Sequence, residues 1–398
     1  MRSGAASESQ AGNMLVTRTQ FGIDRSFITI EQIQRPWEFG RMQSEWNELL
    51  ENSAVDCLFL TWEWLYTWWK HMAENRELSI FAARCRHELI AIAPMAKHPP
   101  NLDRGRPFST LEFLGTGQVG SDYLDFIVRR GYETQTIDAF AGVLAAKRLV
   151  LDWTQLKQPG CVAACIGQCL GDNGWAISAA RTNVCPFIPL DGHTWESYLA
   201  TLGSEHRYSF KRKWKRLQQD FTVRIEQVTT EEECLNAVSL LIKLHNLRWQ
   251  DRGGSDAFCS EPLAKFHREW AELARKRGWL RLFVLYLNEK PAACLYGFCY
   301  RHIFYFYQSG FDPAFASYGV GLVTMGLAIK KAIEEGDREY DLLHGNELYK
   351  SHWSRNSRDI GRLELYPPGG LGRIWRLSVE LGRASRRTAK RLTSRADS

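Results

Sequence analysis

The sequence predicts an α/β chain in which mixed central sheets are flanked by helices and the fold is divided into two halves. The 398 residues are 44% hydrophobic, which is enough to build two ordinary cores, and the length favours two or three domains. Strand-like and helix-like patterns alternate along most of the chain. Asp191 and Gly192 form a turn signal near its middle. The expected divisions are a disordered tail at 1–20, two halves at 21–190 and 191–367, and a basic tail at 368–398.

The first half is expected to alternate short strands with helices. The strands are expected at 27–33, 78–84, 89–96 and 111–114, the helices at 37–50 and 62–73, and further alternation runs through 175–180. Three cysteines, at 161, 165 and 169, fall four residues apart, which would place them on one stripe of a helix. This spacing lacks the CxxC pairs of zinc sites, so we expect reduced, buried thiols and no metal.

The second half is expected to begin with helices and to end in a compact unit of strands and one helix. The helices are expected at 194–202, 204–220 and 231–250, and the strands at 222–227, 280–287, 292–300 and 303–308. Turns at 288–291 and 301–302 separate the last three strands. The loop at 252–255 would cover the cleft between the halves, where ligands commonly bind.

A two-glycine turn follows these strands. Gly319 and Gly321 open a helix whose apolar residues recur at helical spacing, and a strand at 338–343 comes after it. Glycine leaves no side chain in the way of an approaching phosphate, and the unpaired N–H groups of the first helical turn would point at it. This order of elements suits a pyrophosphate beside a reactive centre, and an acyl-CoA is one ligand that would fit. A glycine-softened helix start without a ligand is the alternative.

Three strands, a glycine turn, a helix and a further strand resemble a GNAT N-acetyltransferase domain. The resemblance implies that acetyl-CoA or another acyl-CoA is held by the turn and by the strand before it. The implied contacts are Tyr307, Gln308, Ser317, Tyr318, Gly319, Val320, Gly321 and Leu322. The chain departs from the family at Ala316, because the usual turn carries Arg or Gln three residues before the first glycine.

Further motifs narrow the resemblance. The run Tyr340-Asp341-Leu342-Leu343, with Gly345, Tyr349, Lys350 and Trp353 after it, is similar to a YDFL-G-YK-W signature of the CelD-like, BioF-type acetyltransferase domain. The segments 59–69 (FLTWEWLYTWW) and 114–125 (LGTGQVGSDYLD) look like that family's opening helix and its LG...SDYLD element. The family is related to the Fem peptidyl transferases, which pair two acetyltransferase folds. The resemblance therefore implies tandem GNAT-like folds over about residues 21–366.

Acyl transfer from a thioester to an amine needs a neutral amine, a positioned thioester and stabilisation of a developing oxyanion. Backbone N–H groups near 307–310 would serve as oxyanion donors. Asp341 is the first candidate for removing the amine proton or for holding the ammonium, since it lies on the strand that follows the cofactor helix. His344 is the second, because the pKa of histidine lies near working pH. Bracing the turn at Gly345 is the alternative role for Asp341.

Several polar and aromatic residues are candidates for substrate binding. They are Tyr349, Lys350 and Trp353 from the signature above, Asp122 and Asp125 from the first half, and Arg207 and Lys211 from the basic run at 207–216. The basic run would grip a phosphorylated donor or acceptor, and a nucleic acid such as tRNA is compatible with its interleaved aromatic residues. A solvated helix between the halves is the alternative.

Charge is concentrated at the end of the chain. Residues 371–398 hold eight Lys or Arg against two acidic residues, a net of +6 that equals the net charge of the whole chain. This tail predicts a basic amphipathic helix that lies on an anionic membrane or an acidic partner, or else docks on the body of the protein. No apolar run approaches the ~20 residues that span a bilayer, and no secretory leader is visible, so we expect a cytoplasmic protein, associated with a membrane at most peripherally.

These features favour an acyltransferase that moves an acyl group from acyl-CoA to an amine acceptor. The CelD-like resemblance points toward an amino sugar or a saccharide precursor in exopolysaccharide or cellulose production. One alternative is a Fem-like transferase that uses aminoacyl-tRNA, which Ala316 would tolerate. The other is a non-catalytic scaffold of a membrane-bound synthesis complex, because a fold does not establish a function.

Overall fold

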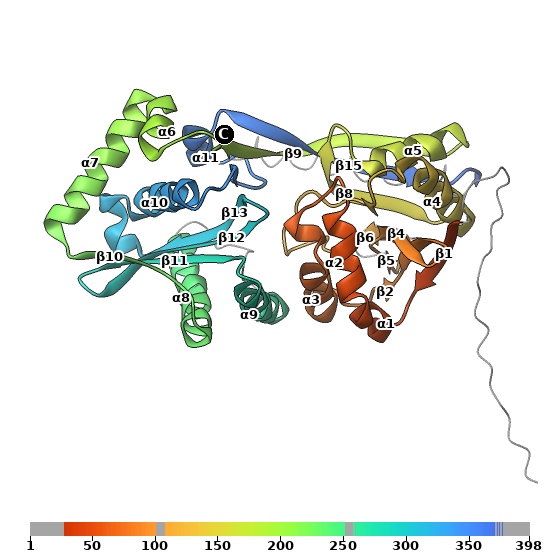
Figure 1. Ribbon diagram of the computed structural model, residues 1–398, viewed down its shortest axis with the longest axis horizontal. Coiled ribbons are helices and arrows are strands. Elements are labelled where there is room, and N and C mark those ends of the chain that lie inside the picture. Colours follow the sequence, from red (N-terminus) through yellow and green to blue (C-terminus); the bar gives the residue numbers. More distant parts are fainter. Residues whose placement is uncertain are drawn as a thin grey trace, which may run out of the picture.

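The computed structural model describes residues 28–100, 108–250, 258, 260–370, 372, 374 and 376. Two lobes lie side by side along the long axis of the molecule (Figure 1). The predictions for the tail at 1–20 and the loop at 252–255 lie outside the described residues, as does most of the basic tail. Within the described parts of the chain, no helix is long and apolar enough to cross a membrane.

The first lobe contains a four-stranded antiparallel sheet in the order β1-β3-β4-β7 and part of a larger sheet. Its strands are β1 (Ile28–Ile33), β2 (Glu77–Leu78), β3 (Ile80–Cys85), β4 (Glu88–Ala93), β5 (Met95–His98), β6 (Thr110–Phe113), β7 (Ile127–Val128) and β8 (Val150–Gln158). Its helices are α1 (Pro36–Arg41), α2 (Gln43–Glu51), α3 (Trp62–Met72), α4 (Glu133–Lys147) and α5 (Val162–Asp172). The tryptophan-rich helix α3 begins after Thr61, whose hydroxyl accepts the N–H of Trp64 and so caps the first turn.

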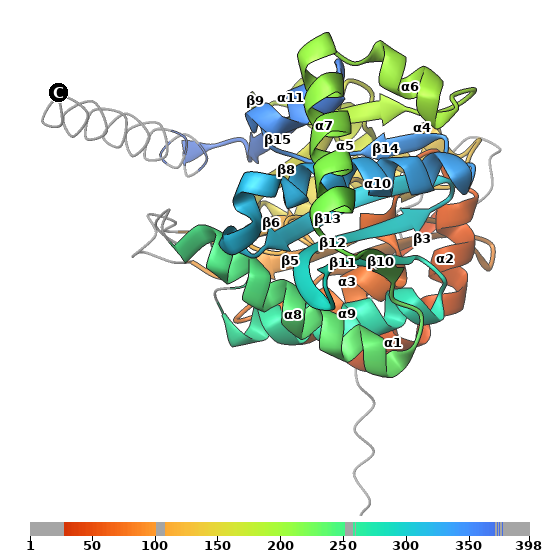
Figure 2. The same ribbon diagram turned by 90° about the vertical axis from the view of Figure 1, so that its left-hand side faces the viewer.

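The second lobe is a sheet with helices on both faces. Its strands are β10 (Val223–Gln227), β11 (Leu280–Leu287), β12 (Lys290–Tyr300), β13 (Ile303–Phe311) and β14 (Glu339–Asp341). Its helices are α6 (Trp195–Thr201), α7 (Ser204–Asp220), α8 (Glu231–Trp249), α9 (Glu261–Lys276), α10 (Val320–Glu334) and α11 (Leu348–Trp353). Helices α8 and α9 cover one face and α10 covers the other, with α7 lying across α10 (Figures 1 and 2). The expected α/β architecture with mixed sheets flanked by helices is confirmed.

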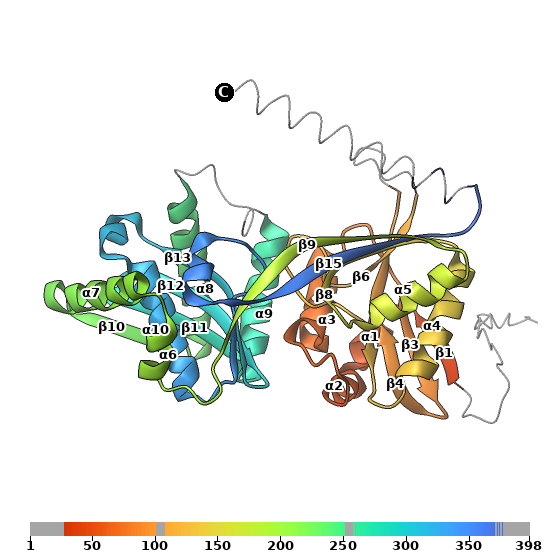
Figure 3. The same cartoon turned by 90° about the horizontal axis from the view of Figure 1, so that it is seen from above.

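Two long strands join the lobes. β9 (Ala176–Pro189) and β15 (Asn356–Tyr366) pair antiparallel and run from one lobe into the other (Figure 3). β14 pairs with the end of β9, and β15 also pairs with β8 of the first lobe. One sheet of eleven strands therefore spans the molecule, in the order β10-β11-β12-β13-β14-β9-β15-β8-β6-β5-β2.

Aromatic side chains also hold the lobes together. Trp64 of α3 is fully buried and packs edge-on against Phe266 and Trp270 of α9, with ring centroids 5.0 and 4.8 Å apart. Phe59 meets Tyr305 of β13 in the same way, at 5.6 Å. Edge-to-face pairs of this kind contribute about 0.5–1.5 kcal/mol each beyond their buried area. The lobes share one core, so residues from both can form a single site.

Several elements differ from the expected ranges. The helix expected at 37–50 is two helices that meet at Met42, and the strand expected at 89–96 divides at Pro94 into β4 and β5, which belong to different sheets. Proline lacks the N–H that a continuous ladder would need. The strand expected at 338–343 ends at Asp341. The cysteines on the α5 stripe are free thiols, but Cys165 is exposed rather than buried.

Candidate active site

The strands β13 and β14 part at the centre of the second lobe. They pair in parallel only as far as Tyr305 and Asp341, and beyond these residues they diverge. The ladder between β12 and β13 shifts register after Tyr296, which leaves Tyr307 without a partner on β12. A bulge of this kind re-aims the backbone and is common beside active sites. The peptide of Tyr307 is therefore outside the ladder with β12, next to the point where β13 and β14 separate.

A cavity of about 200 Å³ occupies this opening. It is lined by Phe306, Tyr307 and Gln308 from β13, by Leu342, Leu343, His344, Glu347, Tyr349 and Lys350 from the segment after β14, by Gln118, Val119 and Gly120 from the first lobe, and by Phe258. Four of the residues expected in the site, Tyr307, Gln308, Tyr349 and Lys350, are thus brought together with His344. The first lobe closes the cavity through a loop, and the Tyr307 hydroxyl donates a hydrogen bond to the carbonyl of Val119.

The glycine turn lies at the same edge of the sheet. The carboxyl ends of parallel strands share one edge, and α10, which connects β13 to β14, begins there. Gly319 adopts a left-handed conformation (φ +70°) as the N-cap of α10, and the N–H groups of the first turn have no acceptor within the helix. Val320 is fully buried and Leu322 is half-buried, and both pack into apolar clusters of the second lobe.

Helix α7 brings positive charge to this turn. The Lys213 ammonium donates to the carbonyl of Ser317 at 3.2 Å, and its side chain packs against Gly319 so closely that a Cβ there would lie 2.3 Å from Lys213 Cδ. The Arg216 guanidinium lies over the ring of Tyr318, 4.4 Å from its centroid. A lysine and an arginine beside a helix N-terminus favour an anion. Both belong to the basic run that was expected to face an anion, although the substrate contacts predicted from that run were Arg207 and Lys211.

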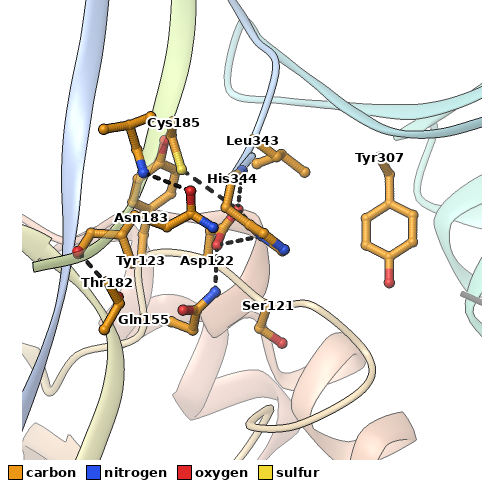
Figure 4. A network of polar contacts seen from close by, with 12 residues as sticks. Ser121, Asp122, Tyr123, Gln155, Thr182, Asn183, Cys185, Tyr307, Leu343 and His344 are labelled. Carbon is orange, nitrogen blue, oxygen red and sulfur yellow. Dashed lines mark hydrogen bonds and ion pairs between the residues drawn. The ribbon is translucent and has the colours of Figure 1, made fainter. Parts of the chain in front are cut away.

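His344 makes a polar contact between the lobes at the cavity. Its Nδ1 lies 2.9 and 3.0 Å from the two carboxylate oxygens of Asp122, and its backbone N–H donates to Asp122 at 2.9 Å. Asp122 is fully buried, whereas 37% of the His344 side chain is exposed. Figure 4 shows the imidazole between Asp122 and the side on which Tyr307 stands. The Asp122 carboxylate raises the pKa of His344 above its ordinary value, more than burial lowers it.

Asp341 is enclosed rather than open to the cavity. It is 1% exposed, and it accepts hydrogen bonds from the Tyr123 hydroxyl (2.7 Å), from Arg358 (3.2 Å) and from the N–H of Leu343 (2.8 Å). Burial raises the pKa of Asp341 to about 7, although Arg358 and Tyr123 oppose the shift. Its neighbours thus fix the start of the segment that lines the cavity.

The three residues Tyr349, Lys350 and Trp353, which follow Gly345 in the sequence, lie in different surroundings. The buried Lys350 donates to the carbonyls of His344 (2.6 Å) and Leu343 (3.3 Å) and pairs with Glu347 (3.0 Å), so its ammonium holds the turn at Gly345 in place. Tyr349 lines the cavity. Trp353 lies away from it, packed against His206 and Phe210.

Asp125 and the basic helix lie apart from the cavity. Asp125 is buried and accepts the N–H groups of Val162 and Ala163, each at 2.8 Å, so it caps α5. α7 lies on the side of the second lobe that faces away from the first (Figure 1). Arg207 and Lys211 line a separate cavity of about 390 Å³ between α6 and α7, together with Trp195, Phe210 and Trp214.

The glycines of the loop at 115–120 were not among the predicted site residues. Gly115, Gly117 and Gly120 all have positive φ angles, and a Cβ on Gly120 would lie 3.4 Å from Cε1 of His344. The spacing GTGQVG was the available signal, since three glycines in six residues indicate a backbone that approaches something closely. No group of three or more metal-ligating side chains occurs in the parts of the chain that the structure describes.

Comparison with known proteins supports the fold. Residues 204–351 match the family model described as an acetyltransferase (GNAT) domain. No curated protein matches the chain. The crystal structure of FemX aligns at 12% identity with a TM-score of 0.58, over 81% of this chain and 95% of that one. The C-terminal domain of a protein described as a lysylphosphatidylglycerol synthetase from Agrobacterium fabrum aligns at 7% identity with a TM-score of 0.53, over 87% and 96%. Similarity at such identities concerns the fold, and the acetyltransferase family is indicated by the matched segment.

Proposed function

We propose that this protein transfers an acyl group from an acyl-CoA to an amine acceptor. The observation that carries the proposal is the cavity between the parted strands β13 and β14, at the sheet edge where the glycine turn opens α10. This geometry suits a thioester in the opening with its pyrophosphate at the helix N-terminus. The match of residues 204–351 to a GNAT domain supports the same reaction class.

The donor would be held mainly by backbone groups. The first-turn N–H groups of Gly321 and Leu322 would face the pyrophosphate, with Lys213 and Arg216 adding positive charge. The unpaired peptide of Tyr307 would donate to the oxyanion that develops on the thioester carbonyl. Gln308 and Tyr349 would line the acyl arm.

His344 would accept the proton of the attacking amine. It lines the cavity, whereas Asp341 is enclosed by Tyr123, Arg358 and Leu343. A general base must lie within hydrogen-bond reach of the proton that it removes. In this proposal Asp341 has the bracing role.

The acceptor class rests on the resemblance alone. A CelD-like domain points to an amino sugar or another saccharide precursor, and hence to polysaccharide production in the cytoplasm. The roughly 200 Å³ cavity has polar and apolar walls, which suits the reacting end of a saccharide amine better than a whole polymer.

A second candidate donor is an aminoacyl-tRNA, as in Fem-like enzymes. The observation that favours it is the exposed basic surface of α7, where Lys211, Arg212 and Lys215 are open to solvent. Such a surface would contact phosphates with a strong dependence on salt.

Calorimetric titration with acetyl-CoA tests the first proposal. Lys213→Ala removes a charge beside the glycine turn and should weaken binding by about 10- to 100-fold, since a hydrogen bond to a charged group contributes about 1.5–3 kcal/mol. Lys215→Ala, on an exposed part of the same helix, is the matched control and should bind like wild type. Gly319→Val is a poor probe, because a Cβ there would collide with Lys213 and strain the backbone.

Absence of binding at about 1 mM acetyl-CoA, the upper end of ordinary KM values, would reject the acyl-CoA proposal. Labelled aminoacyl-tRNA would then be titrated at low and high salt. Equal weakening by both lysine substitutions would instead show that acetyl-CoA binds through general charge and not at the glycine turn.

A further inference from the structure

The contact between Asp122 and His344 has a chemical consequence for the cavity. A carboxylate can only accept hydrogen bonds, so a hydrogen must lie on Nδ1 of His344, which is 2.9 Å from Asp122. A neutral imidazole has one N–H, and therefore Nε2 carries the lone pair. Nδ1 is turned toward the buried carboxylate, and the ring extends from there toward the side on which Tyr307 stands (Figure 4). Its Cε1, between the two nitrogens, lies beside Gly120, and both residues line the cavity.

The first lobe holds Asp122 rigidly in place. Gln155 of β8 donates to one of its carboxylate oxygens at 2.8 Å, and the Cys185 thiol of β9 lies 3.7 Å from the other (Figure 4). The next residue, Tyr123, has a left-handed backbone (φ +61°), which costs a residue with a side chain about 1–2 kcal/mol. This conformation lets successive residues, Asp122 and Tyr123, bind His344 and Asp341 of the other lobe. A strained backbone conformation of this kind persists where the surrounding contacts hold the residue in it.

We propose that Asp122 is the positioning residue of a proton-transfer pair assembled across the two lobes, which keeps the unprotonated Nε2 of His344 directed at the acceptor amine. The amine nitrogen forms a bond to the thioester carbonyl carbon, and Nε2 takes the proton that the nitrogen loses. The carbon–sulfur bond then breaks, and the proton returns from Nε2 to the CoA thiolate. The products are the amide and CoA, and His344 is restored. The acyl-transfer step rests on the proposed function, whereas the tautomer of His344 rests only on the geometry of its contact with Asp122.

The pair has a pH signature. The charged groups around His344 are Asp122 from the first lobe and, from the segment at the start of α11, Lys350 and Glu347. Asp122 raises the pKa of His344 and Lys350 lowers it. His344 must be neutral to accept a proton, so transfer should increase with pH through that pKa. The rise in rate with pH is the acidic limb of the pH–rate profile. Without the charge of Asp122, this limb should move to lower pH.

Asp122→Asn tests the inference, because it keeps the volume of the side chain and an oxygen that accepts the backbone N–H of His344. The amide nitrogen of asparagine would face Nδ1 and favour the tautomer with hydrogen on Nε2, and the Gln155 amide can reverse to match. Asp152→Asn is the matched control, since Asp152 is also buried in the first lobe and pairs with Arg362 instead. Thiol release from acetyl-CoA with glucosamine would be followed against pH, and ¹⁵N-histidine NMR would follow the ring, with His344→Gln giving the assignment.

We expect Asp122→Asn to lower kcat on the order of 10²-fold with KM for acetyl-CoA unchanged, and to move the acidic limb and the NMR titration of His344 to lower pH. The neutral ring should show Nδ1–H in the wild type and Nε2–H in the variant. An unchanged tautomer and titration would overturn the inference, as would an equal loss of kcat in Asp152→Asn without any shift of the limb. Failure of acetyl-CoA to bind would reject the proposed function separately, and the NMR result would still decide whether Asp122 sets the tautomer.

Discussion

Replacing Asp341 by asparagine separates a bracing role from a catalytic one. Asp341 is buried with a pKa of about 7, against about 3.8 for the unfolded chain. A carboxyl group whose pKa is raised by folding contributes stability that is fully present below pH 3.8 and is lost as the pH rises through 7. The difference between the two pKa values corresponds to at most about 4 kcal/mol in the free energy of unfolding. Asparagine cannot ionise, so Asp341→Asn should remove this pH dependence.

The assay is urea unfolding of the wild type and of Asp341→Asn at several pH values between 4 and 8. Relative to the wild type, the free energy of unfolding of the variant should rise with pH by up to about 4 kcal/mol. Arg358 keeps a carboxylate partner in the variant, because it also bonds Glu339 at 2.6 Å. Transfer activity should stay within about tenfold of the wild type, since removing a general base costs about 10²-fold or more. A constant difference in stability would refute the linkage, and a loss of activity in the folded variant would identify Asp341 as the base.

Two further substitutions probe the first lobe, one at the start of α5 and one in the loop that lines the cavity. Asp125→Ala leaves the N–H groups of Val162 and Ala163 without their acceptor and should lower the free energy of unfolding by about 1–2 kcal/mol, measured by urea unfolding; no loss would show that water caps α5 equally well. Gly120→Ala places a side chain at φ +68°, which should cost about 1–2 kcal/mol of stability, and its methyl group would meet His344 Cε1 at 3.4 Å. Calorimetry should show unchanged acetyl-CoA binding, and thiol release should fall because the methyl group narrows the approach to the imidazole; an unimpaired rate would place the acceptor elsewhere.

Local patterns determined most of the elements of the second lobe. The basic helix at 204–220 has the expected ends, and the strands around 280–311 follow from runs of aliphatic and aromatic residues. Gly319 stands at the start of α10 as its spacing indicated. These features depend on residues close together in the chain, so a reading of periodicity and turns can find them. The helix α9 and the strand β15 were not assigned, and β15 shows why: its place between β9 and β8 depends on partners about 200 residues away.

The candidate site was predictable only in part. Tyr307, Gln308, His344, Tyr349 and Lys350 share one cavity, as their order around the glycine turn suggested.

Other roles depended on distant partners. Asp122 and His344 are 222 residues apart in sequence, and Asp341 is enclosed by Tyr123 of the first lobe. Spacing along a chain reports which residues share a local element, whereas the access and ionisation of a side chain depend on what packs around it. The residues thus determined the type of fold and the neighbourhood of the site. The tertiary structure decided that the carboxylate of Asp341 is enclosed and that the imidazole of His344 reaches the cavity.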